Sequence, residues 1–190
     1  MTTVDLTHEL VEQIDWHWRT QLRPRLEGLT DDEYFWEPVA GTWHVRRKAN
    51  STSEFQPGTG DWTIDWAWPE PVPAPVTTIA WRLSHLLVGV LGARIAGHFG
   101  GEPHDYQTYR YPETAADALA RLDDLYRQWL DGVNSWSAAD LAVPVGDREP
   151  AAYADQPRAT LVLHINRELI HHGAEIALLR DLYAHRPLTG

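Results

Sequence analysis

The chain has 190 residues, of which 43% are hydrophobic and 23% charged, as in an ordinary soluble globular protein. Its formal charge of -11 disfavours a nucleic-acid partner, because an acidic surface repels phosphate on average. The sequence contains no cysteine, which excludes disulfides, thiolate metal ligands and a cysteine nucleophile of its own.

No run approaches the roughly eighteen apolar residues that a membrane span needs. The first residues, MTTVDLTHEL, lack the basic and apolar regions of a signal peptide. We therefore expect a cytoplasmic protein without a membrane partner, folded as a single domain over residues 1–190. The one local basic cluster, HVRRK at residues 44–48, is interpreted as a solvated loop and not as a nucleic-acid patch.

Four stretches carry apolar residues at helical spacing, and Pro- or Gly-rich connections separate them. They are residues 5–27, 76–101, 114–136 and 161–183. Pro24 is predicted to kink or end the first helix. Thr77 or Thr78 is a candidate N-cap of the second helix, which Gly100 and Gly101 end.

An all-α four-helix bundle is the simplest way to bury four amphipathic helices in one domain. The first and third connections are long, which predicts at least one crossover instead of a plain up-and-down arrangement. The first connection includes a Trp- and Pro-rich insertion at about residues 38–76, whose tryptophans we expect mainly to pack the loop onto the helices. Little or no sheet is expected.

The apolar stripe of the fourth helix includes two polar residues. Its members are Leu161, Ile165, Glu168, His172, Ile176 and Leu179. A buried carboxylate without a partner costs the fold several kcal/mol or more. Glu168 therefore needs either an ion pair or hydrogen bond, with Arg19, Arg82 or His172 as candidates, or a divalent metal. Glu and His four residues apart place two metal-ligand groups on one helical face.

His85 lies in a strongly apolar run of the second helix, WRLSHLLVGVLG. A buried histidine is most simply a core residue satisfied by a carbonyl or a tyrosine. Together with Glu168 and His172, however, it makes three inward ligands from two helices, which predicts a metal site with open positions. Gly89 and Gly92 are expected to allow a neighbouring helix to approach.

Two further histidines are candidate catalytic residues. His171 neighbours His172 but lies about a hundred degrees round the helix, where it could face Glu175 one turn on. His17 continues the apolar stripe of the first helix and could approach the site. The remaining candidates are expected to be surface residues: His8, His98, His104 and His185.

Three sequence segments resemble the DinB-like superfamily in its actinobacterial branch. They are DDEYFWEPVAGTWHVR, PVTTIAWRLSHLLVG and NRELIHHGAEIALLRDLY. The resemblance implies a four-helix bundle, often a homodimer, with a metal held by one histidine of the second helix and two ligands four apart on the last. It transfers the ligand roles to His85, Glu168 and His172, with Zn²⁺ as the usual ion and Ni²⁺ or another first-row ion as alternatives. Many members carry a histidine where this chain has Glu168, but the mycothiol-dependent maleylpyruvate isomerase group resembles the His, Glu, His pattern.

The resemblance also implies a class of reaction. Members of the superfamily include S-transferases and isomerases that use a low-molecular-weight thiol, so we expect a small-molecule substrate and a thiol cosubstrate such as mycothiol. Two alternatives stay open on the residues alone: a metal-dependent hydrolase that activates water, and a non-catalytic, stress-associated protein that binds a metal or a small molecule.

Overall fold

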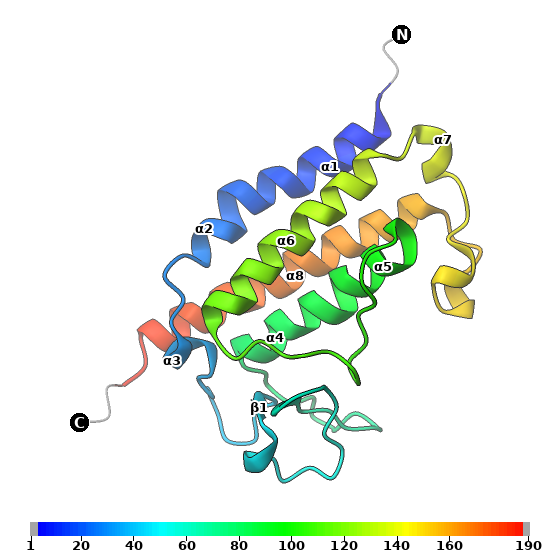
Figure 1. The fold of residues 1–190 in the computed structure, drawn as a ribbon. Helices are drawn as coiled ribbons and strands as arrows, with labels where there is room; N and C mark the ends of the chain where they lie inside the picture. Colours follow the sequence, from blue (N-terminus) through cyan, green and yellow to red (C-terminus); the bar gives the residue numbers. More distant parts are fainter. Residues whose placement is uncertain (1–3, 188–190) are drawn as a thin grey trace.

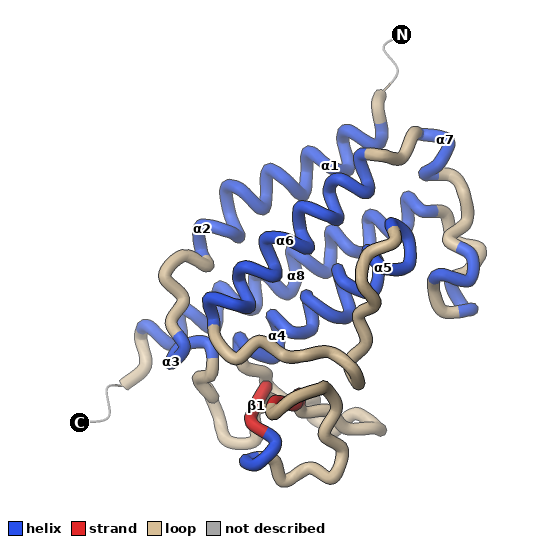
Figure 2. Tube along the Cα trace, viewed as in Figure 1, coloured by secondary structure: helices blue, strands red, loops and turns tan. Residues whose placement is uncertain are grey.

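The computed structural model describes residues 4–187, most of which belong to four long helical segments (Figures 1 and 2). The first consists of α1 (Leu6–His17), a π-helical turn η1 (Trp18–Leu22) and α2 (Arg23–Arg25). The second consists of α4 (Ile79–His85), a π-helical segment η3 (Leu86–Gly92) and α5 (Ala93–Phe99). The third and fourth are α6 (Ala115–Asn134) and α8 (Arg158–Ala184). The all-α expectation is confirmed.

The ends of the second segment follow the predicted signals. The side chain of Thr78 accepts a hydrogen bond from the backbone N–H of Trp81, and Gly100 ends α5 in the left-handed conformation with φ 77°. Helical backbone runs from Leu6 to Arg25 and ends one residue after Pro24, in agreement with the prediction that this proline kinks or ends the first helix. The wider π-helical turn ahead of Pro24 gives its ring room that an α-helical turn would not.

The four segments form a bundle in which α1 packs against α6 and α8, and the α4–α5 segment packs against the same two helices. Figure 1 shows α1 and α8 running in one direction, while the α4–α5 segment and α6 run in the other. The first and second segments therefore lie across one diagonal of the bundle, and the third and fourth across the other. The predicted crossover is confirmed, because residues 26–78 and 135–157 both connect diagonal partners.

One hydrophobic core joins all four segments. Its largest fully buried side chains include Trp129 of α6, Ile14 of α1, and Leu83 of α4. Tyr111, in the connection between α5 and α6, is also completely buried. This connection, residues 100–114, passes back along the bundle beside the second helical segment (Figure 1).

The insertion between the first and second segments is more ordered than its sequence indicates. Ahead of it lies α3 (Asp31–Tyr34), which the side chain of Thr30 caps, and the insertion itself contains a short hairpin of β1 (Val45–Arg47) and β2 (Trp62–Ile64). A 3-10 turn, η2 (Lys48–Asn50), follows β1. The strands are antiparallel, with Val45 opposite Ile64, and this pair of side chains is buried.

The interpretation of residues 44–48 as a solvated loop is therefore wrong. His44 is buried, with Nε2 2.9 Å from the carbonyl oxygen of Phe35. The guanidinium of Arg46 donates to Asp65 at 2.7 Å. Residues 45–47 of the basic cluster form a strand, in which Val45 packs into the body and Arg46 finds a partner in Asp65 at its border.

The tryptophans of the insertion pack onto α4, as expected. Trp66 stacks on Trp81 of α4 with ring centroids 6.1 Å apart, and Trp43 lies 5.7 Å from the same ring. The indole N–H of Trp81 donates to the carbonyl of Asp65 at 2.9 Å. The insertion is thus held against the turn of α4 that precedes His85. Trp68, in contrast, is 88% exposed.

The third connection contains only short helical turns. They are α7 (Ala138–Leu141), η4 (Gly146–Arg148) and η5 (Ala151–Tyr153). A capping box between Ser137 and Asp140 starts α7. The backbone N–H of Val145 donates to the carbonyl of Gln156 at 2.9 Å, which closes this connection on itself beside the start of α8.

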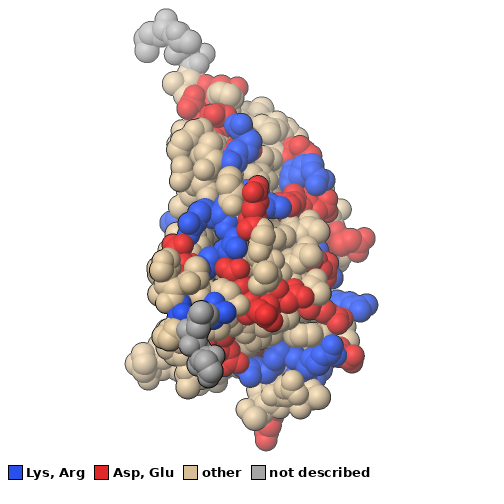
Figure 3. All heavy atoms as spheres, turned by 90° about the vertical axis from the view of Figure 1, so that its left-hand side faces the viewer, with Lys and Arg blue, Asp and Glu red and all other residues tan. Residues whose placement is uncertain are grey.

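Charges of both signs are mixed over the face shown in Figure 3. Ion pairs join different elements, such as Arg25 with Asp181 at 2.6 Å and Arg180 with Glu33 at 2.6 Å. The second pair is largely buried, and the guanidinium of Arg180 also donates to the carbonyl of Glu27 at 2.9 Å. It ties the end of α8 to the first connection.

The helical segment Ile79–Phe99 is the one part of the described chain that is long and apolar enough to span a membrane by length and composition alone. Its mean hydropathy is 1.3, but Arg82, His85 and Arg94 interrupt it, so it is not the unbroken run of about eighteen apolar residues whose absence was expected. Of its most apolar window, however, 67% is buried inside the bundle, which is typical of the core helix of a soluble protein.

Replacement of Trp129 by alanine is expected to lower the free energy of unfolding by about 3–5 kcal/mol, because the ring is fully buried. Trp16→Ala is the matched control: its ring is 52% exposed, and we expect a loss below about 1 kcal/mol. Urea denaturation followed by circular dichroism measures both. Equal losses in the two variants would contradict this account of the core.

Candidate metal centre

His85, Glu168 and His172 come from two adjacent elements of the bundle. His85 is the last residue of α4, and the π-helical segment Leu86–Gly92 starts directly after it. Such π-helical segments are rare and often lie at functional sites. Glu168 and His172 are one turn apart in the middle of α8, which packs against α4 and η3. The bundle therefore brings the three predicted residues together.

Each of the three side chains offers one ligand atom, and these atoms all lie within 4.8 Å of one another. The rings of His85 and His172 are almost perpendicular, at 86°, with centroids 4.8 Å apart. Nε2 of His172 lies 3.2 Å from Oε2 of Glu168. Two imidazoles and one carboxylate thus face a common small volume, as the ligands of a first-row metal do.

The other ring nitrogen of His172 already has a partner. Nδ1 lies 2.7 Å from Oε2 of Glu175, and an ionised carboxylate only accepts hydrogen bonds, so Nδ1 carries the proton. Glu175 is in turn 2.9 Å from Nε of Arg82 on α4. A carboxylate that holds the far nitrogen of a histidine is the usual support of a metal-binding imidazole.

This arrangement leaves His172 between two carboxylates. In a neutral ring with the proton on Nδ1, Nε2 presents a lone pair to Glu168 at 3.2 Å. A lone pair and a carboxylate oxygen repel each other. Positive charge removes the repulsion, either as a second proton on the ring or as a cation between the two atoms.

His85 is held in a similar way by a tyrosine. Its Nδ1 lies 2.6 Å from the phenol oxygen of Tyr106, which comes from the connection between α5 and α6. If Nδ1 donates to this oxygen, the lone pair of His85 is on Nε2. Burial raises the pKa of Tyr106, so its phenol stays protonated.

Gly89 makes room for this contact. A Cβ atom at Gly89 would lie 2.3 Å from the phenol oxygen of Tyr106, and one at Gly92 would lie 2.3 Å from the ring of His104. The expectation that these glycines admit a neighbouring helix is therefore wrong. They leave room for the side chains of Tyr106 and His104, which belong to the connection of residues 100–114. The positions of these loop side chains cannot be predicted from helical periodicity.

His85 is neutral at physiological pH. Burial lowers its pKa to about 3, and the electrostatic influence of its neighbours His172, Arg82 and Arg94 acts in the same direction. A neutral imidazole keeps the lone pair that a metal ion needs. The environment of His85 therefore favours ligation over an ion pair with a carboxylate.

Glu168 lies at the edge of the apolar stripe, with a side chain that is 24% exposed. Besides His172, its contacts are His164 at 3.5 Å and Arg167 at 3.7 Å, both to Oε1. The alternative partners considered from sequence do not reach it: Arg82 pairs with Glu175 and Arg19 with Asp15. The two carboxylate oxygens thus face different groups, Oε2 toward His172 and Oε1 toward the basic side chains of His164 and Arg167 on the solvent side.

The other candidate histidines have different surroundings. His171 is largely exposed, with Nε2 3.5 Å from Oε1 of Glu175, as expected from its spacing. Burial lowers the pKa of His17, and its Nε2 is buried without a hydrogen-bond partner. His17 does not join the ligand groups found among the described residues. His98 is wrongly expected at the surface, since its side chain is 1% exposed and pairs with Glu149 at 3.1 Å.

The sequence did not predict two residues that orient the candidate ligands: Tyr106, which contacts His85, and Arg82, which contacts Glu175. Tyr106 lies in an irregular connection, where no period indicates its direction. Arg82 was considered for Glu168 but supports Glu175. A helical spacing of three residues between His172 and Glu175 is a signal that could have identified that pair.

The donor set fits a divalent first-row ion. Two imidazole nitrogens and one carboxylate oxygen converge, each histidine has a hydrogen-bond partner on its other nitrogen, and three protein ligands leave positions for water or substrate. A second group, His171 with His172 and Glu175, shares His172 with the first. Nδ1 of His172 is hydrogen-bonded to Glu175 and is therefore not free to bind a metal. This second group is better described as the residues that orient His172 for the first group.

Comparison with known proteins agrees with this arrangement. The family model of the DinB superfamily matches residues 13–176, a span that contains all three candidate ligands and most of the bundle. No curated protein and no solved structure gave a match. The chain therefore belongs to the DinB superfamily.

Proposed function

We propose that this protein is a metal-dependent enzyme, a transferase or isomerase that uses a low-molecular-weight thiol of the mycothiol type. His85, Glu168 and His172 would hold a divalent cation, with Zn²⁺ the first choice and Ni²⁺ or another first-row ion as alternatives. The observation that carries the proposal is the meeting of three ligand atoms within 4.8 Å, with both histidines supported from behind.

The residues around the centre suit thiol chemistry. A bound divalent cation would supply Lewis acidity, which lowers the pKa of a thiol or a water molecule. The chain has no cysteine, so the thiol comes from a cosubstrate. Glu168, as an anionic ligand, lowers the net charge of the centre relative to three histidines. His171 is exposed beside His172, with ring centroids 5.1 Å apart, and is the better placed proton acceptor of the two candidates.

A cavity lined by two neighbours of Glu168, though not by the three candidate ligands themselves, supports an enzyme over a purely structural site. His164 and Arg167, which both contact Glu168, line a cavity of about 410 Å³. A metal that only braced the bundle would need no such space. Activated water attacking an ester or amide would use the same open position, so hydrolysis is the second candidate reaction.

Metal analysis tests the proposal directly. Elemental analysis of the purified protein is expected to give about one divalent ion per chain, held by three protein ligands. His85→Ala should lose most of the metal and the thiol-dependent activity while circular dichroism stays unchanged. His185→Ala, which replaces an exposed histidine after the end of α8, should retain both.

Activity is measured with mycothiol and chlorodinitrobenzene as the electrophile, with and without a chelator. Loss of turnover when the chelator removes the metal, with the fold intact, supports the proposal of a metal-dependent enzyme. Equal metal content in His85→Ala and wild type would contradict the ligand assignment. Full metal content with ester hydrolysis but no thiol conjugation would favour the hydrolase.

Gly89→Ala tests the support of His85 by Tyr106. The added Cβ would lie 2.3 Å from the phenol oxygen, so Tyr106 has to move and its hydrogen bond to His85 is lost. We expect metal affinity to fall about tenfold or more, measured by competition with a chromogenic chelator.

Gly97→Ala is the matched control on the same helical segment. Its Cβ would meet no atom closer than 3.6 Å, so alanine should raise helix stability by up to about 1 kcal/mol without changing metal affinity. The same affinity in both variants would show that Tyr106 does not orient His85.

A further inference from the structure

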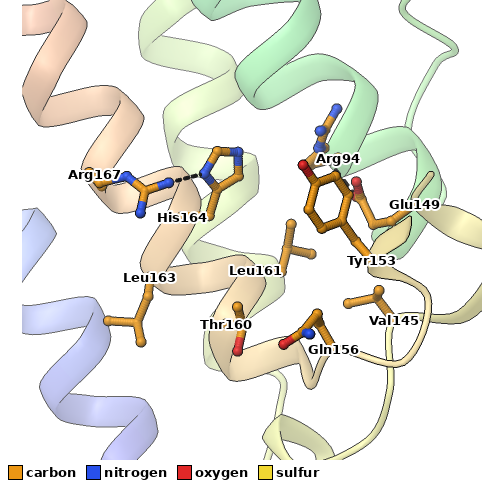
Figure 4. Close-up of a pocket in the computed structure, with 10 residues that line it drawn as sticks. All are labelled: Arg94, Val145, Glu149, Tyr153, Gln156, Thr160, Leu161, Leu163, His164 and Arg167. Atoms are coloured by element: carbon orange, nitrogen blue, oxygen red, sulfur yellow. Dashed lines mark hydrogen bonds and ion pairs between the residues drawn. The ribbon is translucent and has the colours of Figure 1, made fainter. Parts of the chain in front are cut away.

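The cavity beside Glu168 has a polar side and an apolar side. It lies between the first turns of α8, Arg94 of α5 and the connection 135–157, and its volume is about 410 Å³ (Figure 4). Leu161 and Val145 are buried core residues whose side chains form part of its wall, and the exposed ring of Tyr153 stands over it. This volume lies within the range of small-molecule sites, roughly 300–1,000 Å³.

The basic side chains of the cavity lie on the side of the candidate metal centre. His164 and Arg167 contact Oε1 of Glu168 at 3.5 and 3.7 Å. Arg94 donates to the carbonyl of Gly89 at 3.0 Å, in the π-helical segment that follows His85. In Figure 4, His164 and Arg167 project from α8, and Arg94 projects from the neighbouring helix.

The hydrogen bonds and ion pairs within the cavity wall show which donors are already engaged and which remain available to a ligand. Arg167 donates to Nδ1 of His164 at 2.6 Å, so the proton of a neutral His164 is on Nε2, which is a donor. Arg94 is engaged with Glu149 at 3.2 Å, and Glu149 also pairs with His98 at 3.1 Å. The donors that remain available are therefore mainly those of Arg167 and the imidazole N–H of His164.

The charge of the lining matches one negative charge. Its permanently ionised side chains are Arg94, Arg167 and Glu149, which gives two positive charges against one negative, a net charge of +1. The chain as a whole carries -11. The lining alone has a positive excess, which attracts a monoanion in such an acidic protein. Glu168, which contacts Arg167 and His164 from outside the lining, offsets part of this excess and disfavours a doubly charged ligand.

We propose that this cavity binds a small organic acid: its carboxylate on Arg167 and His164, its apolar body against Leu161, Val145 and Tyr153. An arginine with a planar fork of donors suits a carboxylate. The further step, that the acid is thereby presented to a metal at His85, Glu168 and His172, rests on the proposed function. The carboxylate site itself does not.

Titration calorimetry with hexanoate, and with hexanamide as the neutral analogue, tests the site. We expect hexanoate to bind the full chain and hexanamide to bind much more weakly. Arg167→Gln should weaken hexanoate about tenfold through loss of a charge-assisted contact. Arg127→Gln, an equally exposed arginine on α6 with a side chain 65% exposed against 69%, should bind like wild type.

A second pair of variants tests the apolar wall. Leu163 lines the cavity and is 57% exposed, while Leu178 on the same helix is 59% exposed and outside it. Leu163→Ser should weaken hexanoate, and Leu178→Ser should not. Both replacements are at the surface, so the fold is expected to survive.

Titration of the metal-free protein separates this proposal from the proposed function. Hexanoate binding that persists after chelation and depends on Arg167 supports the cavity site even if no metal is found. Equal affinities for hexanoate and hexanamide overturn it. Binding that requires zinc and ignores Arg167→Gln also overturns it, because the carboxylate would then coordinate the metal itself.

Discussion

His172 lies between two carboxylates, and most of the candidate centre follows from that constraint. One ring nitrogen donates to Glu175 at 2.7 Å, and the other faces Glu168 at 3.2 Å. A neutral imidazole satisfies only one of these contacts, so the site needs positive charge near Nε2. His85 approaches the same point from α4 as a neutral base and cannot supply that charge. A second proton on His172 would supply it, and so would the cation that we propose, which would also use the lone pairs of both histidines.

The topology of the bundle makes this meeting possible. Because the first two helical segments are diagonal partners, α8 returns beside the α4–α5 segment and faces His85. The long insertion packs its tryptophans onto Trp81, one turn before His85. The connection of residues 100–114 places Tyr106 on the ring of His85. Segments that look irregular in sequence thus fix the orientation of a ligand.

The helices and the three central residues could be predicted because their signals are local. Caps, glycines and helical spacing mark the ends of α4, α5 and α6, and Glu168 and His172 share one helical face with aliphatic neighbours. Tyr106 and the burial of His98 depend on loops whose path is set by tertiary packing. For the same reason, residues 44–48 were misassigned: their strand pairs with β2, whose first residue lies well downstream. Pairing between strands that are distant in the sequence cannot be predicted from the few residues around either strand.

The most direct test of the central claim is a crystal structure of the zinc-loaded protein, with anomalous diffraction measured on both sides of the zinc absorption edge. We predict one anomalous peak within bonding distance, about 2.0–2.2 Å, of Nε2 of His85, Nε2 of His172 and a carboxylate oxygen of Glu168. No peak there, with His172 hydrogen-bonded through both nitrogens to Glu168 and Glu175, would show that a second proton supplies the charge and would contradict the account.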